Sequence, residues 1–131
     1  MVFDLDDLPP ELDAFLTERH LATLTVTRSD GSPQVTPVGV TYQPETRTAR
    51  VITWADSYKA RTVAADPGQP VAVCQVDGGR WLTIYGRATV TTEPDAVAEA
   101  VRRYAARYRQ PKERDDRVVI EIAVDRLVGR A

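Results

Sequence analysis

Hydrophobic and polar residues alternate in several short stretches of this chain, a pattern typical of strands with one buried face. The first stretch, Leu21 to Arg28, places apolar residues on one face and threonines on the other. Asp30-Gly31 follows it and accepts the positive φ that a tight hairpin needs. The pattern therefore predicts a β-hairpin whose second strand runs from Pro33 to Tyr42.

Further strands are predicted at Arg50–Trp54, Val71–Val76, Arg80–Thr92 and Arg117–Asp125. Gly86, in the middle of a strand, predicts a bulge or bend of the kind that curls a sheet. Pro37 removes a backbone donor and so predicts an edge or bulged strand. Six antiparallel strands in hairpin order, the first three as a meander, predict a small barrel.

Apolar residues return at helical spacing in two segments. The first helix is expected from Asp6 to Arg19, capped by Asp7 or a neighbour, and the second from Glu93 to Gln110. The arginines of the second helix are interpreted mostly as a solvated cationic face. We therefore expect a mostly β protein with peripheral helices, forming one domain over residues 1–131.

A third, short helical segment is predicted after the strand that ends at Trp54. Asp56 and Ser57 supply N-cap chemistry for it. Its N-terminus would direct unpaired backbone N–H groups, and a partial positive charge, beyond the strand end. Lys59 and Arg61 would add to that field, so this segment is a candidate phosphate seat. The alternative is that both cations lie on a solvated helix face.

Net charge and residue composition argue against some classes of function for this protein. The net charge of −2 argues against a nucleic-acid-binding protein. Cys74 is the one cysteine and stands in an apolar run, which fits simple packing and a reducing cytoplasm. His20 is interpreted as a structural hydrogen-bonding group. We find no secretion signal, no membrane span, no metal-ligand cluster and no nucleotide-binding glycine motif, so any catalysis is expected to rest on a bound cofactor.

Several segments occur in an order that is more specific than any one of them: Phe15–Ala22, Ala49–Thr53, Ser57–Ala60, Cys74–Gly78, Arg80–Leu82 and Arg103–Arg109. Together they resemble the split β-barrel superfamily of flavin- and deazaflavin-binding proteins related to pyridoxamine-phosphate oxidase. Within it, the chain resembles the actinobacterial branch that uses coenzyme F420, and most closely the F420-dependent biliverdin reductases. The resemblance implies a six-stranded antiparallel split barrel, the FMN-binding fold, and a cytoplasmic homodimer with the cofactor in a groove between the barrels.

The resemblance also implies which residues contact the cofactor. Lys59 is the expected phosphate ligand, and the segment around Pro37 is expected to lie along the cofactor ring. Residues near Gln75 and Trp81 are expected to line the groove near the dimer interface. The full set is Gln34, Thr36, Pro37, Val38, Ile52, Thr53, Ser57, Lys59, Ala60, Arg61, Gln75, Val76, Asp77, Gly78 and Trp81.

The function implied is hydride transfer from reduced F420 to an organic acceptor, such as biliverdin or a similar tetrapyrrole, whose propionates Arg80 or Arg61 would hold. No proton donor is assigned. Tyr58 stands where flavin-phosphate oxidases carry an arginine, which argues against FMN, and Thr62-Val63 replaces the Asn-Leu that often follows Lys-x-Arg. The alternatives are an FMN-dependent oxidase or reductase of the same fold and a non-catalytic cofactor- or tetrapyrrole-binding protein.

Overall fold

Seven strands form a single antiparallel sheet in the computed structural model, which describes all 131 residues. The sheet order is β2-β1-β5-β6-β7-β4-β3. The elements are α1 (Pro10–Thr17), β1 (Ala22–Thr27), β2 (Pro33–Val38), β3 (Thr41–Gln43), β4 (Thr48–Trp54), α2 (Tyr58–Ala65), β5 (Gln69–Asp77), β6 (Arg80–Thr91), α3 (Pro94–Arg107) and β7 (Arg117–Arg130). The predicted mostly β class with peripheral helices is confirmed.

Strand count and closure differ from the prediction. The strand expected from Pro33 to Tyr42 is two strands, so the sheet has seven strands rather than six, and its two edges are not hydrogen-bonded into a closed barrel. β2 pairs with β1 whereas β3 pairs with β4, so the predicted three-stranded meander is wrong. Pro37 does lie on an edge strand, β2, as predicted.

The break between β2 and β3 has a clear physical cause at Gly39 and Val40. A Cβ at Gly39 would lie 2.7 Å from the Tyr104 ring, because the chain here passes tightly against α3. The N–H of Val40 donates to the Tyr108 hydroxyl (3.0 Å), and its carbonyl accepts from the Arg107 guanidinium (2.6 Å). Side chains at the C-terminal end of α3 thus bond the N–H and carbonyl of Val40, which would otherwise be free to continue the strand pairing.

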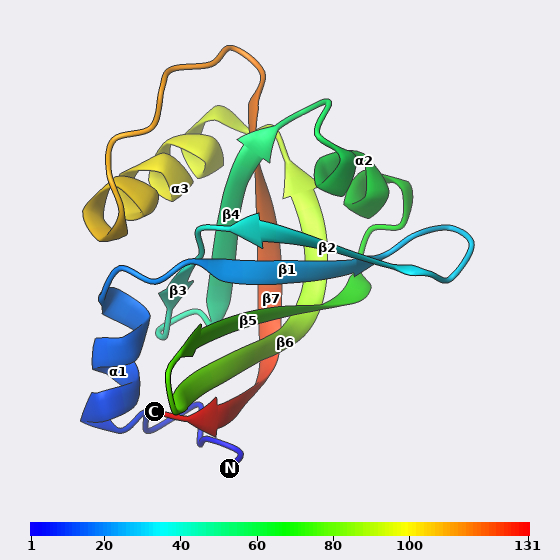
Figure 1. Cartoon of the computed structure of the whole chain (residues 1–131). Coiled ribbons are helices and arrows are strands. Elements are labelled where there is room, and N and C mark those ends of the chain that lie inside the picture. The colour runs from blue at the N-terminus through cyan, green and yellow to red at the C-terminus, as the bar shows by residue number, and fades with distance from the viewer.

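The sheet folds over on itself, so that β1, β2 and β5 cross in front of β4 and β7 (Figure 1). The predicted bulge at Gly86 is confirmed: the β6–β7 register shifts between Tyr85 and Gly86. A Cβ at Gly86 would meet the Ala123 carbonyl oxygen at 2.4 Å, so only glycine permits this close approach. The bend encloses a core of buried aliphatic side chains from β1, β4, β5, β6 and β7.

The helices lie around the sheet (Figure 1). α1 buries Leu12, Phe15 and Leu16 in the core, but its N-cap is Pro9 and the predicted capping by Asp7 does not occur. α2 follows β4 directly and packs against β6 and β1, and α3 packs against β4 and β7. None of the three helices has the length and apolar character that crossing a membrane requires.

Candidate functional site

A cavity of about 340 Å³ opens where the end of β4 meets the β2–β3 link, the start of α2 and the end of α3. This volume is at the lower end of the range for ligand pockets. We refer to it as the Lys59 cavity. It is lined by Pro37, Val38, Gly39, Ile52, Thr53, Trp54, Lys59, Tyr104, Arg109, Gln110, Pro111, Lys112 and Arg117. The structure thus brings together five residues predicted to contact the cofactor: Pro37, Val38, Ile52, Thr53 and Lys59.

The junction between β4 and α2 positions Lys59. The Ser57 hydroxyl accepts hydrogen bonds from the Ala60 N–H (3.3 Å) and the Thr53 hydroxyl (2.9 Å), so the predicted cap is confirmed. The Ser57 carbonyl accepts from the Arg61 N–H (3.0 Å). Ser57 and Ala60 are therefore buried parts of the junction that places Lys59 in the first turn of α2, and their side chains do not line the cavity.

Lys59 is half-buried, and its ammonium lies 5.3 Å from the centroid of the Trp54 ring. Burial lowers the pKa of Lys59 below its ordinary value of 10.5. None of the salt bridges of this protein involves Lys59. A partly desolvated ammonium without a carboxylate partner favours binding of an anion, because the anion supplies the missing countercharge.

Three further cations line the Lys59 cavity: Arg109, Lys112 and Arg117. Arg117 donates to the Lys112 carbonyl (2.8 Å) and more weakly to that of Thr53 (3.5 Å). The sequence analysis did not assign these residues to the site. Arg117 reaches the site because it pairs with Trp54 between β4 and β7. The sequence alone does not give this pairing, so it could not identify Arg117 as a site residue.

Arg107 and Tyr108 hold the wall of this cavity. The Arg107 side chain is 9% exposed and donates to the carbonyls of Phe15 (3.2 Å), Glu18 (2.9 Å) and Val40 (2.6 Å), and to the Gln75 side chain (3.0 Å). The Tyr108 hydroxyl donates to the His20 carbonyl (2.6 Å). The interpretation of the arginines of this helix as a solvated face is thus wrong for Arg107.

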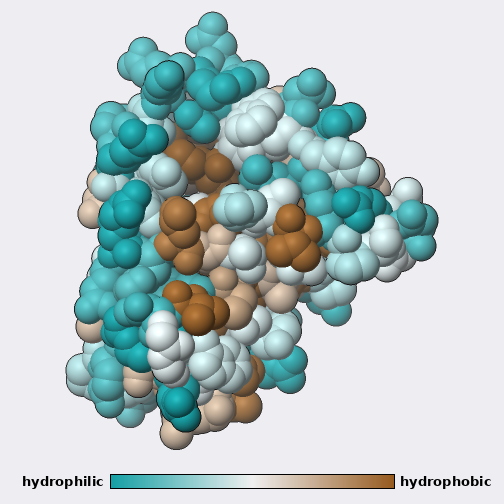
Figure 2. All heavy atoms as spheres, in the orientation of Figure 1, coloured by the Kyte–Doolittle hydropathy of each residue, from teal (hydrophilic) through white to brown (hydrophobic).

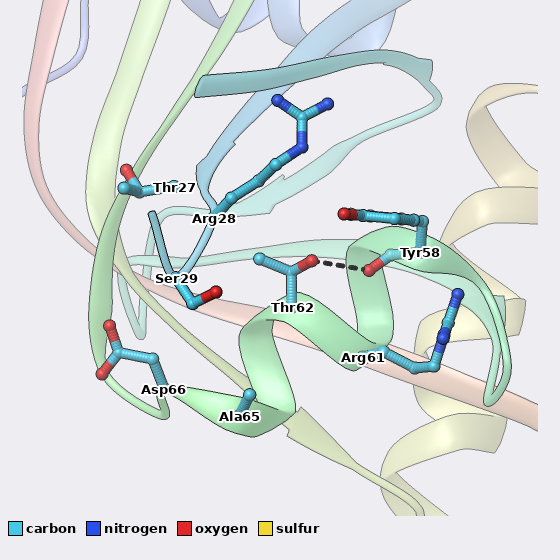
Figure 3. A pocket seen from close by; sticks show the side chains of 8 residues that line it. All are labelled: Thr27, Arg28, Ser29, Tyr58, Arg61, Thr62, Ala65 and Asp66. Atoms are coloured by element: carbon cyan, nitrogen blue, oxygen red, sulfur yellow. Dashed lines mark hydrogen bonds between the residues drawn. The ribbon is translucent and has the colours of Figure 1, made fainter. Parts of the chain in front are cut away.

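Arg61 and Lys59 do not share a cavity. Arg61 lines a second cavity of about 380 Å³ between the β1–β2 hairpin and α2 (Figure 3). There the guanidinium groups of Arg28 and Arg61 lie 5.7 and 5.4 Å from the centroid of the Tyr58 ring, which stands between them. Arg61 is also paired with Asp56 at 3.7 Å. Lys59 and Arg61, which were predicted together as a phosphate seat, therefore line different cavities on two sides of α2.

The strand expected along the cofactor ring presents two faces. Gln34, Thr36 and Val38 alternate with the exposed Val35 and Pro37. Gln34 is 9% exposed, and its side-chain oxygen is buried without a hydrogen-bond partner. An orphaned buried acceptor is costly unless a ligand or water donates to it. This observation fits a ligand with an N–H or O–H group, and it is independent of the cavity cations.

The remaining predicted residues lie at the β5–β6 turn, at the opposite end of the molecule from α2 (Figure 1). The Gln75 side chain is buried and bonded internally to Phe15 and Arg107. Val76 and Trp81 face each other across the two strands and are exposed, Asp77 ends β5, and Gly78 lies in the turn. These residues and Lys59 do not line one cavity of a single chain.

Arg80, the predicted propionate ligand, is already paired. Its guanidinium donates to Asp77 (2.6 Å) and Glu18 (3.2 Å), and lies over the Phe15 ring at 4.5 Å. His20 has the structural role expected of it, because it bonds Glu18 at 3.1 Å and packs edge-on against Phe15. The structure shows no cluster of metal-ligating side chains.

Comparison with known proteins is consistent with this architecture. A curated relative, the F420H(2)-dependent biliverdin reductase of Mycobacterium tuberculosis (strain CDC 1551 / Oshkosh), is 52% identical over 118 residues, covering 90% of this chain and 85% of the relative. The solved structure of an F420 reductase superposes with a TM-score of 0.73 at 22% identity, covering 92% of this chain and 98% of the other.

The structure of HutZ, a heme storage protein from Vibrio cholerae, superposes with a TM-score of 0.74 at 16% identity, covering 92% of this chain and 93% of the other. At such identities the two superpositions establish the fold alone. The family model described as pyridoxamine 5'-phosphate oxidase matches residues 8–130, nearly the whole chain. With this match and a relative that shares half of its residues, the chain belongs to the pyridoxamine 5'-phosphate oxidase family.

Proposed function

We propose that this protein is a coenzyme F420-dependent reductase that acts on an organic acceptor, biliverdin or a similar conjugated tetrapyrrole. The observation that carries the proposal is the Lys59 cavity, in which an unpaired, half-buried ammonium stands beside a flat wall of strand residues. The 52% identical relative named for this activity supports the choice of cofactor and acceptor. When bound, reduced F420 supplies a hydride for the acceptor.

The residues of this chain bind and orient the cofactor. Lys59 provides a charge-assisted contact for its phosphate. Pro37, Val38 and Thr53 form the surface against which a planar ring lies and from which water is excluded. Together these contacts fix the distance between cofactor and acceptor, and that positioning is the contribution of the protein to the rate. Gln34 does not line this cavity, so the contact predicted between its side chain and the cofactor stays a prediction.

The proposal includes a homodimer. The outward residues of β1, β2 and β5 are covered by no helix and carry no charge (Figure 1). Those residues are Thr23, Thr25 and Thr27 on β1, Pro33, Val35 and Pro37 on β2, and Pro70, Ala72, Cys74 and Val76 on β5. Figure 2 shows hydrophobic groups gathered on this face. In a two-fold dimer, Val76 to Gly78 and Trp81 of one chain can complete the groove of the other.

Fluorescence titration tests the proposed cofactor. Trp54 lines the Lys59 cavity, so quenching that occurs in the wild-type protein and is lost in Trp54→Phe reports on that cavity. We expect F420 to quench Trp54 with a Kd at or below the micromolar range, and FMN to bind much more weakly. Reduced F420 should then be oxidised in the presence of biliverdin.

Other outcomes would redirect the assignment. Tighter binding of FMN than of F420 would move the protein to the flavin branch of the family. Binding of F420 and biliverdin without oxidation of reduced F420 would mean that the protein is a carrier. Quenching of Trp54 that persists unchanged in Lys59→Ala would place the phosphate elsewhere.

A further inference from the structure

The Lys59 cavity has four cationic side chains, Lys59, Arg109, Lys112 and Arg117, and no acidic one among its lining residues. None of the four forms a salt bridge, although the chain as a whole has a net charge of −2. Like charges gathered without countercharges repel one another. This concentration therefore points to an anionic ligand with more negative charge than one phosphate contact at Lys59 would need.

Three neighbouring arginines outside the cavity do have carboxylate partners. Arg102 and Arg103, on the exposed part of α3, bond Glu99 at 2.7 and 2.6 Å. Arg114 pairs with Asp116 at 2.8 Å. Glu113 and Asp115 line a separate depression against α3, which Lys112 and Arg117 also line from their other side. The acids of this loop are close in sequence and still do not line the Lys59 cavity.

The four cationic side chains of the cavity differ in how far they are buried. Lys59 and Arg117 are half-buried, whereas Arg109 and Lys112 are exposed. The half-buried Arg117 anchors the loop that carries Arg109 and Lys112, because its guanidinium donates to the Lys112 carbonyl at 2.8 Å. Pro111 also restricts this loop. Arg109 and Lys112 are thus kept at the mouth of the cavity.

We propose that Arg109 and Lys112 form a carboxylate-binding rim of the Lys59 cavity. This inference rests on the proposed function and deepens it: the rim takes the role that the sequence analysis gave to Arg80 and Arg61. Arg80 is paired with Asp77 and Glu18, and Arg61 lines the other side of α2. A planar guanidinium matches a carboxylate in geometry, and a neighbouring ammonium adds a point charge. The carboxylates come either from the propionates of the acceptor or from the acidic side chain of F420.

The test compares Arg109→Ala/Lys112→Ala with Arg102→Ala, a control that removes one positive charge from α3 outside the cavity. Equilibrium binding of F420, biliverdin and biliverdin dimethyl ester is measured by quenching of Trp54, and KM and kcat for both acceptors are measured at saturating reduced F420. Both residues of the double variant are exposed, so the fold is expected to remain intact.

We expect the double variant to raise the Kd and KM for biliverdin about tenfold, with little change for the ester or in kcat. A tenfold loss of F420 affinity instead would also support a carboxylate rim and would identify the cofactor as the source of the carboxylates. If the double variant matches Arg102→Ala for every ligand, the rim does not exist. Failure of the wild-type protein to oxidise reduced F420 would reject the proposed function, whereas the binding titrations would still decide the rim.

Discussion

Lys59 carries its charge where water is partly excluded, which makes the charge responsive to ligand and to pH. Burial favours the neutral amine and lowers the pKa of Lys59. Since no carboxylate partner offsets that cost, an anion bound in the cavity gains more from Lys59 than it would from a solvated lysine. Arg61 is two residues away, but it is exposed and paired with Asp56.

Removal of the ammonium tests the role of Lys59 directly. We expect Lys59→Ala to weaken F420 binding by about 1.5–3 kcal/mol, the range for a hydrogen bond to a charged group. Isothermal titration calorimetry of both proteins provides the measurement. The matched control is Arg61→Ala, which should change the affinity by far less, because Arg61 lines the other cavity.

The lowered pKa of Lys59 predicts the sign of a pH effect. In the free protein, Lys59 loses its proton as the pH rises through a value below 10.5. An anion binds the protonated form better, so affinity should fall over that alkaline range while proton uptake on binding rises. In Lys59→Arg the charge persists, because arginine keeps its proton throughout.

The measurement is the ratio of the Kd of wild-type protein to that of Lys59→Arg, taken between about pH 7 and pH 10. Using the ratio removes the titration of the ligand itself. A ratio that stays constant with pH would show that the Lys59 charge does not contribute to binding.

Among the elements, the C-terminal end of α3 determines the shape of the site. Arg107 and Tyr108 bond the N–H and carbonyl of Val40, and they also tie α3 to the end of α1 through Glu18 and His20. Gly39 permits the close approach of α3 to the β2–β3 link. The cavity wall at Pro37 to Gly39 is therefore held by a helix that lies more than fifty residues later in the sequence.

Loss of these bonds should destabilise the fold. Tyr108→Phe removes the acceptor of the Val40 N–H and the donor to the His20 carbonyl, and we expect it to lower the free energy of unfolding by about 1–3 kcal/mol. Arg107→Leu removes the hydrogen bonds to three carbonyl groups and should cost more, although the Phe15 carbonyl keeps its bond from Gln75. Urea denaturation followed by circular dichroism measures both.

Arg102→Ala, on the exposed part of the same helix, is the control for these variants and should stay within about 0.5 kcal/mol of wild type. A Tyr108→Phe protein as stable as wild type would mean that water replaces the hydroxyl, and that α3 does not hold the wall in the way described.

At the scale of the whole molecule, the uncharged outer face of β1, β2 and β5 indicates how two copies of the chain would associate. A face of threonine, valine, proline and alanine without one charged side chain is unusual for a surface exposed to water. The same arrangement separates Trp81 and the β5–β6 turn from the Lys59 cavity within one chain. Both features are accounted for when two copies pack through this face.

Analytical ultracentrifugation provides the test of assembly. We expect a particle of twice the 14.5 kDa chain mass. Val35→Glu, in the middle of β2 on this face, should shift it to monomer, because burying an unpaired carboxylate is costly. Ala98→Glu, an equal change on the exposed side of α3, should leave the mass unchanged. A wild-type protein that sediments at 14.5 kDa at all concentrations would refute the dimer.

The sequence by itself determined the local features of this protein. Runs of apolar residues located the segments that form strands, although they joined β2 and β3 into one. Ser57 located the start of α2 and Gly86 located the bulge, because each depends on neighbours within a few residues. The order of segments also pointed to the family, and four of the other expected cofactor residues share one cavity with Lys59.

Only the tertiary structure decided which distant groups meet. The split of the strand at Gly39, the burial of Arg107, and the separation of Lys59 from Arg61 depend on where α3 packs and on the direction in which α2 leaves β4. Arg109, Lys112 and Arg117 are ordinary cations in the sequence and enter the site only because β7 pairs with β4. Periodicity reports the face on which a side chain lies, whereas long-range pairing decides what lies opposite it.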